Sequence, residues 1–325
     1  MSIKTIAVLT SGGDSPGMNA AIRAIVRTAA YNNLNVMGVM HGYNGLINNE
    51  IKQLTSANVG NIIQHGGTIL KTSRSKGFVT TEGMQQAYNN IQKHHIDALI
   101  VIGGDGTFKG AQEFGTIYNF PIIGLPGTID NDLVGTDFTI GYDTAINTVV
   151  EAVDRIRDTA ASHDRLFFVE VMGRDAGLIA LRSGIGVGAE AILMPETPTQ
   201  LNELIEKLTN DQRRKKSSSI VIVAEGEEEG GAYALVKRLQ PSLPNFDIRV
   251  SILGHIQRGG SPTAMDRVLA SRMGYAAVNA IIQNQSGFMI GVIHNKIAQT
   301  PFAQATKHIQ TLDADLLKMI EVLAM

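Results

Sequence analysis

Glycine and aspartate occur together in three short motifs whose residue types suit phosphate and metal binding. The motifs are SGGD at Ser11–Asp14, GGDGT at Gly103–Thr107 and PGTIDND at Pro126–Asp132. Glycine lets backbone N–H groups approach an anion closely, and a helix N-terminus adds a favourable partial charge. Asp105 is a hard oxygen ligand of the kind that Mg²⁺ prefers. The motifs therefore predict a site for a polyphosphate with a divalent cation.

Each motif also has a simpler structural interpretation. A Gly-Gly pair after a strand can be only a tight turn, and Asp105 can cap the helix that follows it. The segment Asp130–Asp132 can be an Asx-turn, although a turn does not require Thr128 and two carboxylates together. Two carboxylates two residues apart can divide their roles, one as a general base and the other facing a cation. No Gly-Lys-Ser/Thr follows Ser11–Asp14, so this is not a Walker A loop.

Arginines accompany these motifs along the chain. Arg74, Arg165, Arg174, Arg249 and Arg258 are expected in or beside the polar loops that follow the strands. A guanidinium group stays charged and contacts phosphate through two parallel hydrogen bonds, although for any single arginine a surface ion pair is the favoured interpretation. Their repeated placement favours an anionic substrate.

The motifs must be positioned by a sheet, because short apolar runs precede them. These runs, each followed by a segment of helical period, predict an α/β architecture with a mainly parallel sheet. The expected strands are 6–9, 98–102, 122–125, 166–171, 220–224 and 250–253. The expected helices are 18–30, with Ser15 as a possible cap, 144–159, 200–209 and 263–283. Ligands of open α/β sheets bind beyond the carboxyl ends of the strands, where the polar loops are expected.

Composition narrows the class of protein. The 325 residues include 28 Lys plus Arg and 30 Asp plus Glu, a formal net charge of -2, which argues against a general nucleic-acid binder. The absence of cysteine excludes disulfides, thiolate metal sites and a cysteine nucleophile. We find no signal peptide and no run long enough to span a membrane, so we expect a soluble, cytoplasmic protein with no nucleic-acid or membrane partner. The length favours two domains.

The motifs, together with Met172–Arg174 and Leu253–Pro262 (LGHIQRGGSP), resemble those of the bacterial ATP-dependent 6-phosphofructokinase family from residue 3 to about residue 295. The resemblance implies two similar Rossmann-like three-layer α/β/α domains with mainly parallel sheets and an active site in the cleft between them. The larger, ATP-binding domain would be 1–140 plus about 256–305. The smaller, substrate-binding domain would be 141–255 plus about 306–325.

The resemblance also assigns roles to residues. Asp130 would be the general base for the 1-hydroxyl of fructose 6-phosphate, with Thr128, Arg174, Arg74 and Gly13 completing the catalytic set, and Asp105 would hold Mg²⁺. The ATP site would comprise Gly13, Tyr43, Arg74, Ser75, Phe78, Gly104, Asp105, Gly106 and Thr107. The fructose 6-phosphate site would comprise Thr128, Ile129, Asp130, Arg165, Met172, Gly173, Arg174, Glu225, Arg249, His255, Ile256, Gln257 and Arg258.

Regulation and assembly follow from the same resemblance. Members of this family are homotetramers with active and effector sites at subunit interfaces. They are activated by ADP and inhibited by phosphoenolpyruvate. By this resemblance, Arg165 and Arg249 would reach into the active site of a neighbouring subunit. The effector residues would be Arg23, Arg27, Arg157, Gly188, Ala189, Glu190, Arg214, Lys216, Ser217 and Ser218. From the residues alone, this basic set is better explained as solvated helix faces. Ser218 replaces a usual His, and Leu178 a usual Asp.

The phosphoryl donor is predicted to be ATP. Pyrophosphate-dependent relatives tend to carry Asp at position 106 and Lys at position 127, where this chain has Gly106 and Gly127. An acidic side chain at 106 would crowd and repel the α-phosphate of a nucleotide. The alternatives are a pyrophosphate-dependent kinase, a kinase of another sugar phosphate, and a non-catalytic nucleotide sensor.

Overall fold

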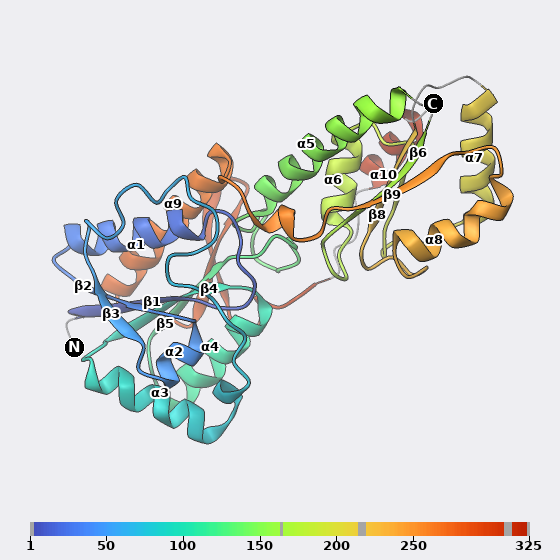
Figure 1. Ribbon diagram of the computed structural model, residues 1–325. Coiled ribbons are helices and arrows are strands. Elements are labelled where there is room, and N and C mark those ends of the chain that lie inside the picture. Colours follow the sequence, from blue (N-terminus) through green and yellow to red (C-terminus); the bar gives the residue numbers. More distant parts are fainter. Residues whose placement is uncertain (1–2, 163–164, 214–218, 309–313, 324–325) are drawn as a thin grey trace. The chain divides into compact units, whose positions relative to one another are not determined.

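The computed structural model describes residues 3–162, 165–213, 219–308 and 314–323 (Figure 1). The chain forms two compact units that each combine separate stretches of sequence. Unit 1 comprises Met1–Ile129, Leu133–Thr144 and Arg258–His308, and unit 2 comprises Asp130–Asp132, Ala145–Gln257 and Ile309–Met325. In the described part of the chain, no helix is long and apolar enough to cross a membrane.

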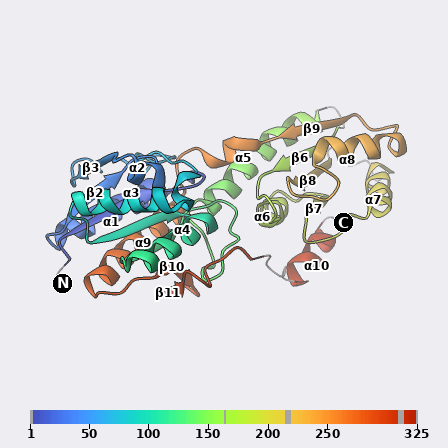
Figure 2. The same cartoon turned by 90° about the horizontal axis from the view of Figure 1, so that it is seen from below.

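Unit 1 is built on a 7-stranded sheet in the order β11-β10-β5-β4-β1-β2-β3. Its strands are β1 (Thr5–Thr10), β2 (Asn35–Val39), β3 (Ile51–Leu54), β4 (Ala98–Gly103), β5 (Ile122–Pro126), β10 (Phe288–Ile293) and β11 (Lys296–Pro301). Its helices are α1 (Met18–Tyr31), α2 (Tyr43–Ile47), η1 (Gly77–Val79), α3 (Thr81–Lys93), α4 (Asp105–Tyr118) and α9 (Ala264–Ile282). The pairs β2–β3 and β10–β11 are antiparallel, and the other pairs are parallel. The edge strands are β3 and β11, which lie on opposite sides of unit 1 (Figure 2).

Both faces of this sheet are buried, as the uniformly apolar strands predict. Along β1, Ile6 and Val8 pack into one cluster with α1 and α9. The alternate residues, Ala7 and Leu9, pack into a second cluster with α3 and α4. The result is the predicted arrangement of helices on both faces of a mainly parallel sheet.

The strand order reverses between β1 and β4. From β1 the sheet grows through β2 to β3 on one side, and through β4 to β5 on the other. Such a reversal opens a crevice at the carboxyl ends of the strands, where doubly wound proteins bind ligands. The motifs Ser11–Asp14 and Gly103–Thr107 emerge at this point, because β1 and β4 are parallel neighbours with Thr10 opposite Ile102.

Unit 2 contains a 4-stranded, wholly parallel sheet in the order β7-β8-β6-β9. Its strands are β6 (Leu166–Val171), β7 (Ala191–Leu193), β8 (Ser219–Ala224) and β9 (Ile248–Ile252). Its helices are α5 (Tyr142–Ala161), whose first residues belong to unit 1, α6 (Leu178–Gly186), α7 (Leu201–Arg213), α8 (Ala232–Leu239), η2 (Gln240–Ser242), η3 (Gly254–Arg258) and α10 (Ala314–Leu323). Val221 and Val223 pack with α7 and α8, whereas α6 lies against the other face of β8 (Figure 1).

The sequence-based expectations agree with the structure for the long apolar strands and for the four predicted helices. The expected helix 200–209 continues to Arg213. Ser15 does not cap α1. The N-cap is Gly17, in the left-handed conformation with φ 112°, and the Ser15 hydroxyl, fully buried, has no hydrogen-bond partner among the described residues. Glycine adopts this backbone conformation without the steric cost that a Cβ would impose.

A buried carboxylate joins the N-termini of two helices in unit 1. Asp266, in the first turn of α9 and fully buried, accepts hydrogen bonds from the N–H of Gly141 (2.8 Å), the N–H of Thr144 (2.8 Å) and the Thr144 hydroxyl (2.6 Å). It thereby caps the start of α5, while the Thr263 hydroxyl caps α9 by accepting from Asp266 N–H. Burial raises the pKa of Asp266 to about 6, against the lowering effect of its hydrogen bonds, and nearby Asp143 raises it further.

We predict that Asp266→Asn changes how stability depends on pH. Because the pKa of Asp266 is higher in the folded protein, its contribution to the free energy of unfolding is full below about pH 4 and is lost as the pH rises through about 6. This difference in pKa corresponds to about 3 kcal/mol. Asparagine does not titrate, so the free energy of unfolding of wild type minus that of the variant should fall by about 3 kcal/mol between pH 4 and pH 7 in urea unfolding. A constant difference would contradict the assignment.

Candidate active site

Three loops of unit 1 meet at the carboxyl edge of its sheet. After β1, the Ser11 N–H donates to Ile102 O (2.9 Å), and after β5, the Gly127 N–H donates to Gly103 O (3.0 Å). The Thr107 hydroxyl donates to Ser11 O (3.3 Å), which joins the loops after β4 and β1. The three motifs identified from sequence are therefore held together, as their positions after neighbouring parallel strands predict.

The glycines of GGDGT have different structural roles. A Cβ on Gly103 would lie 2.3 Å from Thr107 Oγ1 and 2.5 Å from Ser11 O, so close packing requires glycine here. A Cβ on Gly104 would meet only Thr128 Cβ, at 3.8 Å, and one on Gly106 would meet nothing within 4 Å. Gly104 and Gly106 therefore leave open space at the N-terminus of α4, where a phosphate group can approach the backbone.

Asp105 does not cap α4, because the helix begins at Asp105 and its N-cap is Gly104. The carboxylate instead pairs with Lys109 Nζ (2.7 Å) and accepts from Lys307 N–H (3.2 Å). No group of three or more metal-binding side chains occurs in the part of the chain that the structure describes. One carboxylate beside an open helix N-terminus fits Mg²⁺, which is commonly held by one or two carboxylates, water and substrate phosphates. The exposed Lys109 pair is weak enough to be displaced.

The residues expected beside an adenine are close to each other but largely enclosed. Tyr43 and Phe78 stack with ring centroids 3.9 Å apart and are only 4% and 2% exposed. The Tyr43 hydroxyl donates to Thr107 O (2.7 Å), and burial raises its pKa. Ser75 Oγ accepts from Phe78 N–H, and Arg74 is exposed on the same loop. Contact of these residues with a nucleotide stays a prediction.

Unit 2 presents a second group of predicted residues at the carboxyl edge of its own sheet. The loop after β6 contains Met172 and Gly173, both buried, and Arg174, whose φ is 54°. Arg174 Nε lies 3.6 Å from Oδ2 of Asp130, which is 3% exposed. Arg174 N–H donates to Glu225 Oε1 (2.7 Å). A buried carboxylate thus faces a guanidinium group that is itself half exposed.

The remaining substrate candidates differ in accessibility. His255 and Ile256 are exposed, whereas Ile129 and Gln257 are fully buried, and Thr128 is half-buried. Gln257 uses both ends of its amide inside the protein, because Oε1 accepts from Met172 N–H (3.1 Å) and Nε2 donates to Gly254 O (3.0 Å). This arrangement suits support of the β6 loop better than contact with a ligand.

Arg258 lies against the loop after β1 in unit 1. Its Nη1 donates to Asp14 O (3.0 Å), and a Cβ on Gly13 would lie 2.6 Å from the same nitrogen. Only glycine at position 13 lets the guanidinium group approach the backbone this closely. The structure therefore brings Arg258, which is predicted to bind the sugar phosphate, next to Gly13, which is predicted to bind ATP.

Arg165 and Arg249 do not lie with the other arginines. Arg165 precedes β6 and Arg249 is the second residue of β9, so both lie at the amino edge of the sheet, about 20 Å from Arg174 along six residues of strand. Asp247 binds both, with Nε of Arg165 at 2.8 Å and Nη2 of Arg249 at 2.9 Å. The hydrogen bond from Arg165 lowers the pKa of Asp247. The expectation that all five arginines cluster at strand carboxyl ends is wrong for this pair.

The predicted effector residues are only partly described. On α5, Arg157 donates to the carbonyl of Val187 and lies near Gly188 O (3.5 Å), beside the buried Ala189 and Glu190. Arg23 and Arg27 lie on α1, in unit 1. Arg214, Lys216, Ser217 and Ser218 lie outside the described residues.

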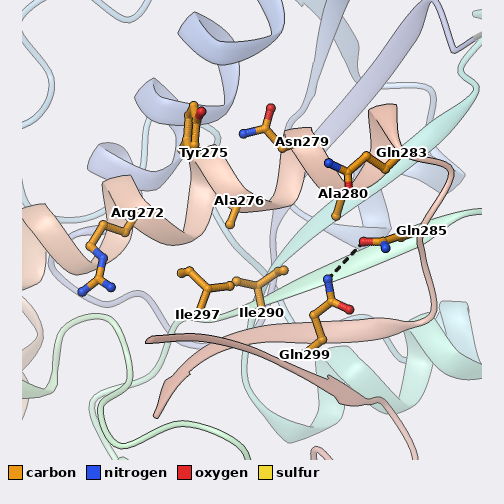
Figure 3. A pocket seen from close by; sticks show the side chains of 10 residues that line it. All are labelled: Arg272, Tyr275, Ala276, Asn279, Ala280, Gln283, Gln285, Ile290, Ile297 and Gln299. Carbon is orange, nitrogen blue, oxygen red and sulfur yellow. Dashed lines mark hydrogen bonds between the residues drawn. The ribbon is translucent and has the colours of Figure 1, made fainter. Parts of the chain in front are cut away.

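A pocket of about 330 Å³ lies elsewhere in unit 1, between α9, β10 and β11 (Figure 3). Figure 3 shows Ile290 and Ile297 facing Ala276 of α9, with the hydrogen-bonded pair Gln299 and Gln285 (3.1 Å) at one side of the pocket. None of the predicted site residues lines this pocket. Its mostly neutral lining does not suit a polyphosphate, so it is not the candidate active site.

The strand order of unit 1 and the glycine-rich turns at its switch point define a doubly wound α/β protein. The family model "Phosphofructokinase" matches residues 5–281. The chain belongs to the phosphofructokinase family.

Curated relatives match this chain over nearly their full length. The "ATP-dependent 6-phosphofructokinase 2" of Bacteroides thetaiotaomicron is 56% identical, over 99% of this chain and 99% of that protein. The "ATP-dependent 6-phosphofructokinase 1" of Thermus thermophilus is 52% identical, over 99% of this chain and 100% of that protein.

Solved structures agree on the fold. Phosphofructokinase from Saccharomyces cerevisiae has a TM-score of 0.86 at 37% identity, over 98% of this chain and 46% of that chain. A pyrophosphate-dependent phosphofructokinase from Marinobacter aquaeolei has a TM-score of 0.85 at 21% identity, over 99% of this chain and 92% of that chain. The second likeness shows the fold alone.

Two carboxylates that contact the backbone of these loops were not expected from the sequence. Glu196 Oε1 accepts from Gly177 N–H (2.7 Å), next to the β6 loop, and Asp266 holds Gly141 in unit 1. Glu196 follows β7, a strand of 3 residues that is too short to be recognised as a strand by pattern. An acidic residue after a strand would have been a usable signal had the strand been identified.

We predict that Gly103→Ala destabilises the protein. The added methyl group would overlap Ser11 O, a backbone atom, and Thr107 Oγ1, and such overpacking costs about 1–3 kcal/mol. The matched control is Gly104→Ala, whose Cβ would have ordinary contacts. Urea unfolding of both variants should show a loss for Gly103→Ala alone. Equal free energies of unfolding in the two variants would contradict the packing argument.

Proposed function

We propose that this protein is an ATP-dependent 6-phosphofructokinase, which transfers the γ-phosphoryl group of ATP to the 1-hydroxyl of fructose 6-phosphate in glycolysis. The products are fructose 1,6-bisphosphate and ADP. The full-length relatives of that name support this activity. The structural observation that carries the proposal is the buried Asp130 with Arg174 Nε 3.6 Å away, because phosphoryl transfer to a hydroxyl uses a base and a cation together.

Asp130 would accept the proton of the 1-hydroxyl as this oxygen attacks the γ-phosphorus of ATP. The bond between the bridging oxygen and the γ-phosphorus breaks in line, and ADP leaves. Because the transition state is loose, catalysis depends on position and on neutralising negative charge. Arg174, which lies beside Asp130, and Arg258, which lies beside Gly13, would supply positive charge, with Arg74 and Thr128 completing the proposed set.

The nucleotide would bind at the switch point of unit 1. Gly104 and Gly106 leave the start of α4 open to phosphate oxygens, and Thr107 and Gly13 flank this space. Asp105 would hold Mg²⁺, which when bound neutralises charge on the phosphate oxygens. Tyr43, Ser75 and Phe78 are proposed to lie on the adenine side.

Fructose 6-phosphate would contact the loops of unit 2. We assign direct contacts to Arg174, Glu225, His255 and Arg258 and to the backbone of Met172 and Gly173. Exposure of His255 and half-exposure of the Arg174 side chain support these contacts. Gln257 would act indirectly, because its amide is already engaged with Met172 and Gly254.

The placement of Arg165 and Arg249 supports assembly into a homotetramer. They lie at the amino edge of the unit 2 sheet, whereas Arg174 lies at its carboxyl edge. If both groups bind fructose 6-phosphate, they must serve different subunits, so each active site would be completed by a neighbour. Units 1 and 2 would be the larger and smaller domains, and the enzyme would act in the cytoplasm.

We propose that ADP and phosphoenolpyruvate regulate the enzyme by binding at the predicted effector residues. Arg157, which lies near Gly188 O, would give one half of such a site within unit 2, together with Glu190 two residues further along the chain. Arg23 and Arg27 on α1 would supply the other half, from a neighbouring subunit in the proposed tetramer.

We predict that Asp130→Ala lowers kcat by about 10²–10⁴-fold, because the general base is lost. Binding of fructose 6-phosphate, measured by calorimetry, should persist, since Asp130 acts on the hydroxyl and not on the phosphate group. The value of kcat is measured with an enzymatic assay that couples the production of fructose 1,6-bisphosphate to the colour change of a dye. Undiminished turnover would eliminate the mechanism and would favour a nucleotide sensor.

We predict that Gly106→Asp impairs the use of ATP without unfolding the protein. A Cβ at this position meets no heavy atom within 4 Å, so the variant should keep its thermal stability. The added carboxylate would repel the nucleotide phosphates, so KM for ATP should rise at least about 10-fold. Initial rates with ATP and with pyrophosphate test this. An unchanged KM for ATP would place the nucleotide elsewhere.

A further inference from the structure

Three backbone N–H groups of the loop after β6 are held by side chains from the other three strand ends of unit 2. Met172 N–H donates to Gln257 Oε1 (3.1 Å), beyond β9, and Arg174 N–H donates to Glu225 Oε1 (2.7 Å), beyond β8. Gly177 N–H donates to Glu196 Oε1 (2.7 Å), beyond β7. In the sheet β6 lies between β8 and β9, with β7 beyond β8. The loop after β6 is therefore hydrogen-bonded to the segments that follow all three other strands at the carboxyl edge. We call Met172–Gly177 the anchored loop.

The anchored loop has an unusual backbone. Gly173 has a φ of 141° and Arg174 a φ of 54°, and Ala176 N–H closes the turn on Gly173 O (3.0 Å). A Cβ on Gly226 would lie 1.9 Å from Arg174 O, so the loop after β8 presses directly on this carbonyl. A left-handed arginine persists only where its surroundings determine the conformation. The anchors therefore set the direction of the Arg174 side chain.

Glu196 is the anchor at the far end of this loop. The first turn of α6 contains no acidic residue, and its N-cap, Gly177, has no side chain. Glu196 Oε1 takes the Gly177 N–H, while Oε2 is buried without a hydrogen-bond partner among the described residues. A Cβ on Gly177 would lie 2.5 Å from that second oxygen. Glu196 therefore supplies the acceptor that neither the N-cap nor the first turn of α6 provides.

We propose that Glu196 is a positioning residue for the reaction. It fixes the Gly177 end of the anchored loop, so that Arg174 keeps the left-handed backbone from which its Nε faces Asp130. Glu196 does not touch substrate and acts through Arg174. This role rests on the proposed phosphofructokinase activity, in which Arg174 neutralises charge beside the general base.

The test compares Glu196→Ala and Glu196→Gln with the control Glu228→Ala. Glu228 Oε1 also accepts a backbone N–H, that of Thr199 (2.9 Å), in the segment that follows Glu196, but neither residue of this bond belongs to the anchored loop. Each alanine variant therefore loses one glutamate-to-backbone hydrogen bond. Glutamine at 196 keeps the acceptor for Gly177 N–H and removes only the charge.

We expect Glu196→Ala to lower kcat/KM for fructose 6-phosphate about 10- to 100-fold, since small misplacement of a charged group costs rates of this size. KM for ATP should change less than about twofold, because the proposed nucleotide residues lie in unit 1. Glu196→Gln should restore kcat/KM to within about threefold of wild type. Glu228→Ala should leave it unchanged. If Glu196→Ala does not fold, Glu196→Asp, one methylene shorter, replaces it.

Hydrogen exchange provides a readout that does not depend on catalysis. Exchange of a peptide covering 172–178 should accelerate in Glu196→Ala and stay protected in Glu196→Gln and Glu228→Ala. Faster exchange with unchanged kcat/KM would overturn the positioning role, and unchanged exchange would overturn the anchor itself. If wild-type protein does not phosphorylate fructose 6-phosphate, the proposed function fails, and the exchange result still decides whether Glu196 anchors the loop.

Discussion

The parallel register of β1, β4 and β5 is the constraint on which the rest of unit 1 depends. Thr10 pairs with Ile102, and Gly103 pairs with Pro126, so the three strands end at nearly the same level. Residues 96 positions apart in sequence, Ser11 and Thr107, therefore lie in hydrogen-bonding range, and the glycines must tolerate this proximity. Gly103 is enclosed for this reason, whereas Gly104 and Gly106, which follow it, have room for a Cβ.

The parallel register of strands has a different consequence in unit 2. Its sheet places β6 in the middle, and the loops after β7, β8 and β9 supply acceptors to the N–H groups of the loop after β6. The outcome is a rigid support for one exposed cation rather than an open space for an anion. Asp130, which belongs to the same unit and is buried, faces that cation.

The sequence predicted what depends on local pattern. The apolar strands, the mainly parallel sheet and the polar strand ends are confirmed, because burial on both faces leaves uninterrupted apolar runs. It did not predict contacts set by the packing of distant segments: Asp266 with Gly141, Glu196 with Gly177, or Asp247 between two arginines. Ser15 resembled a cap, but the left-handed Gly17 takes that position. The effector residues from Arg214 to Ser218 stay predictions.

The cluster of Arg165, Asp247 and Arg249 has an electrostatic consequence of its own. Two guanidinium groups share one carboxylate, so the cluster carries one net positive charge at the amino edge of the sheet. Asp247 holds both guanidinium groups but neutralises only one of their two charges. The positions of the two groups are therefore set before any ligand binds. An anion is attracted to such an edge over roughly one Debye length, about 8 Å at physiological ionic strength. Added salt would therefore slow the encounter with an anion while leaving the geometry of the cluster in place.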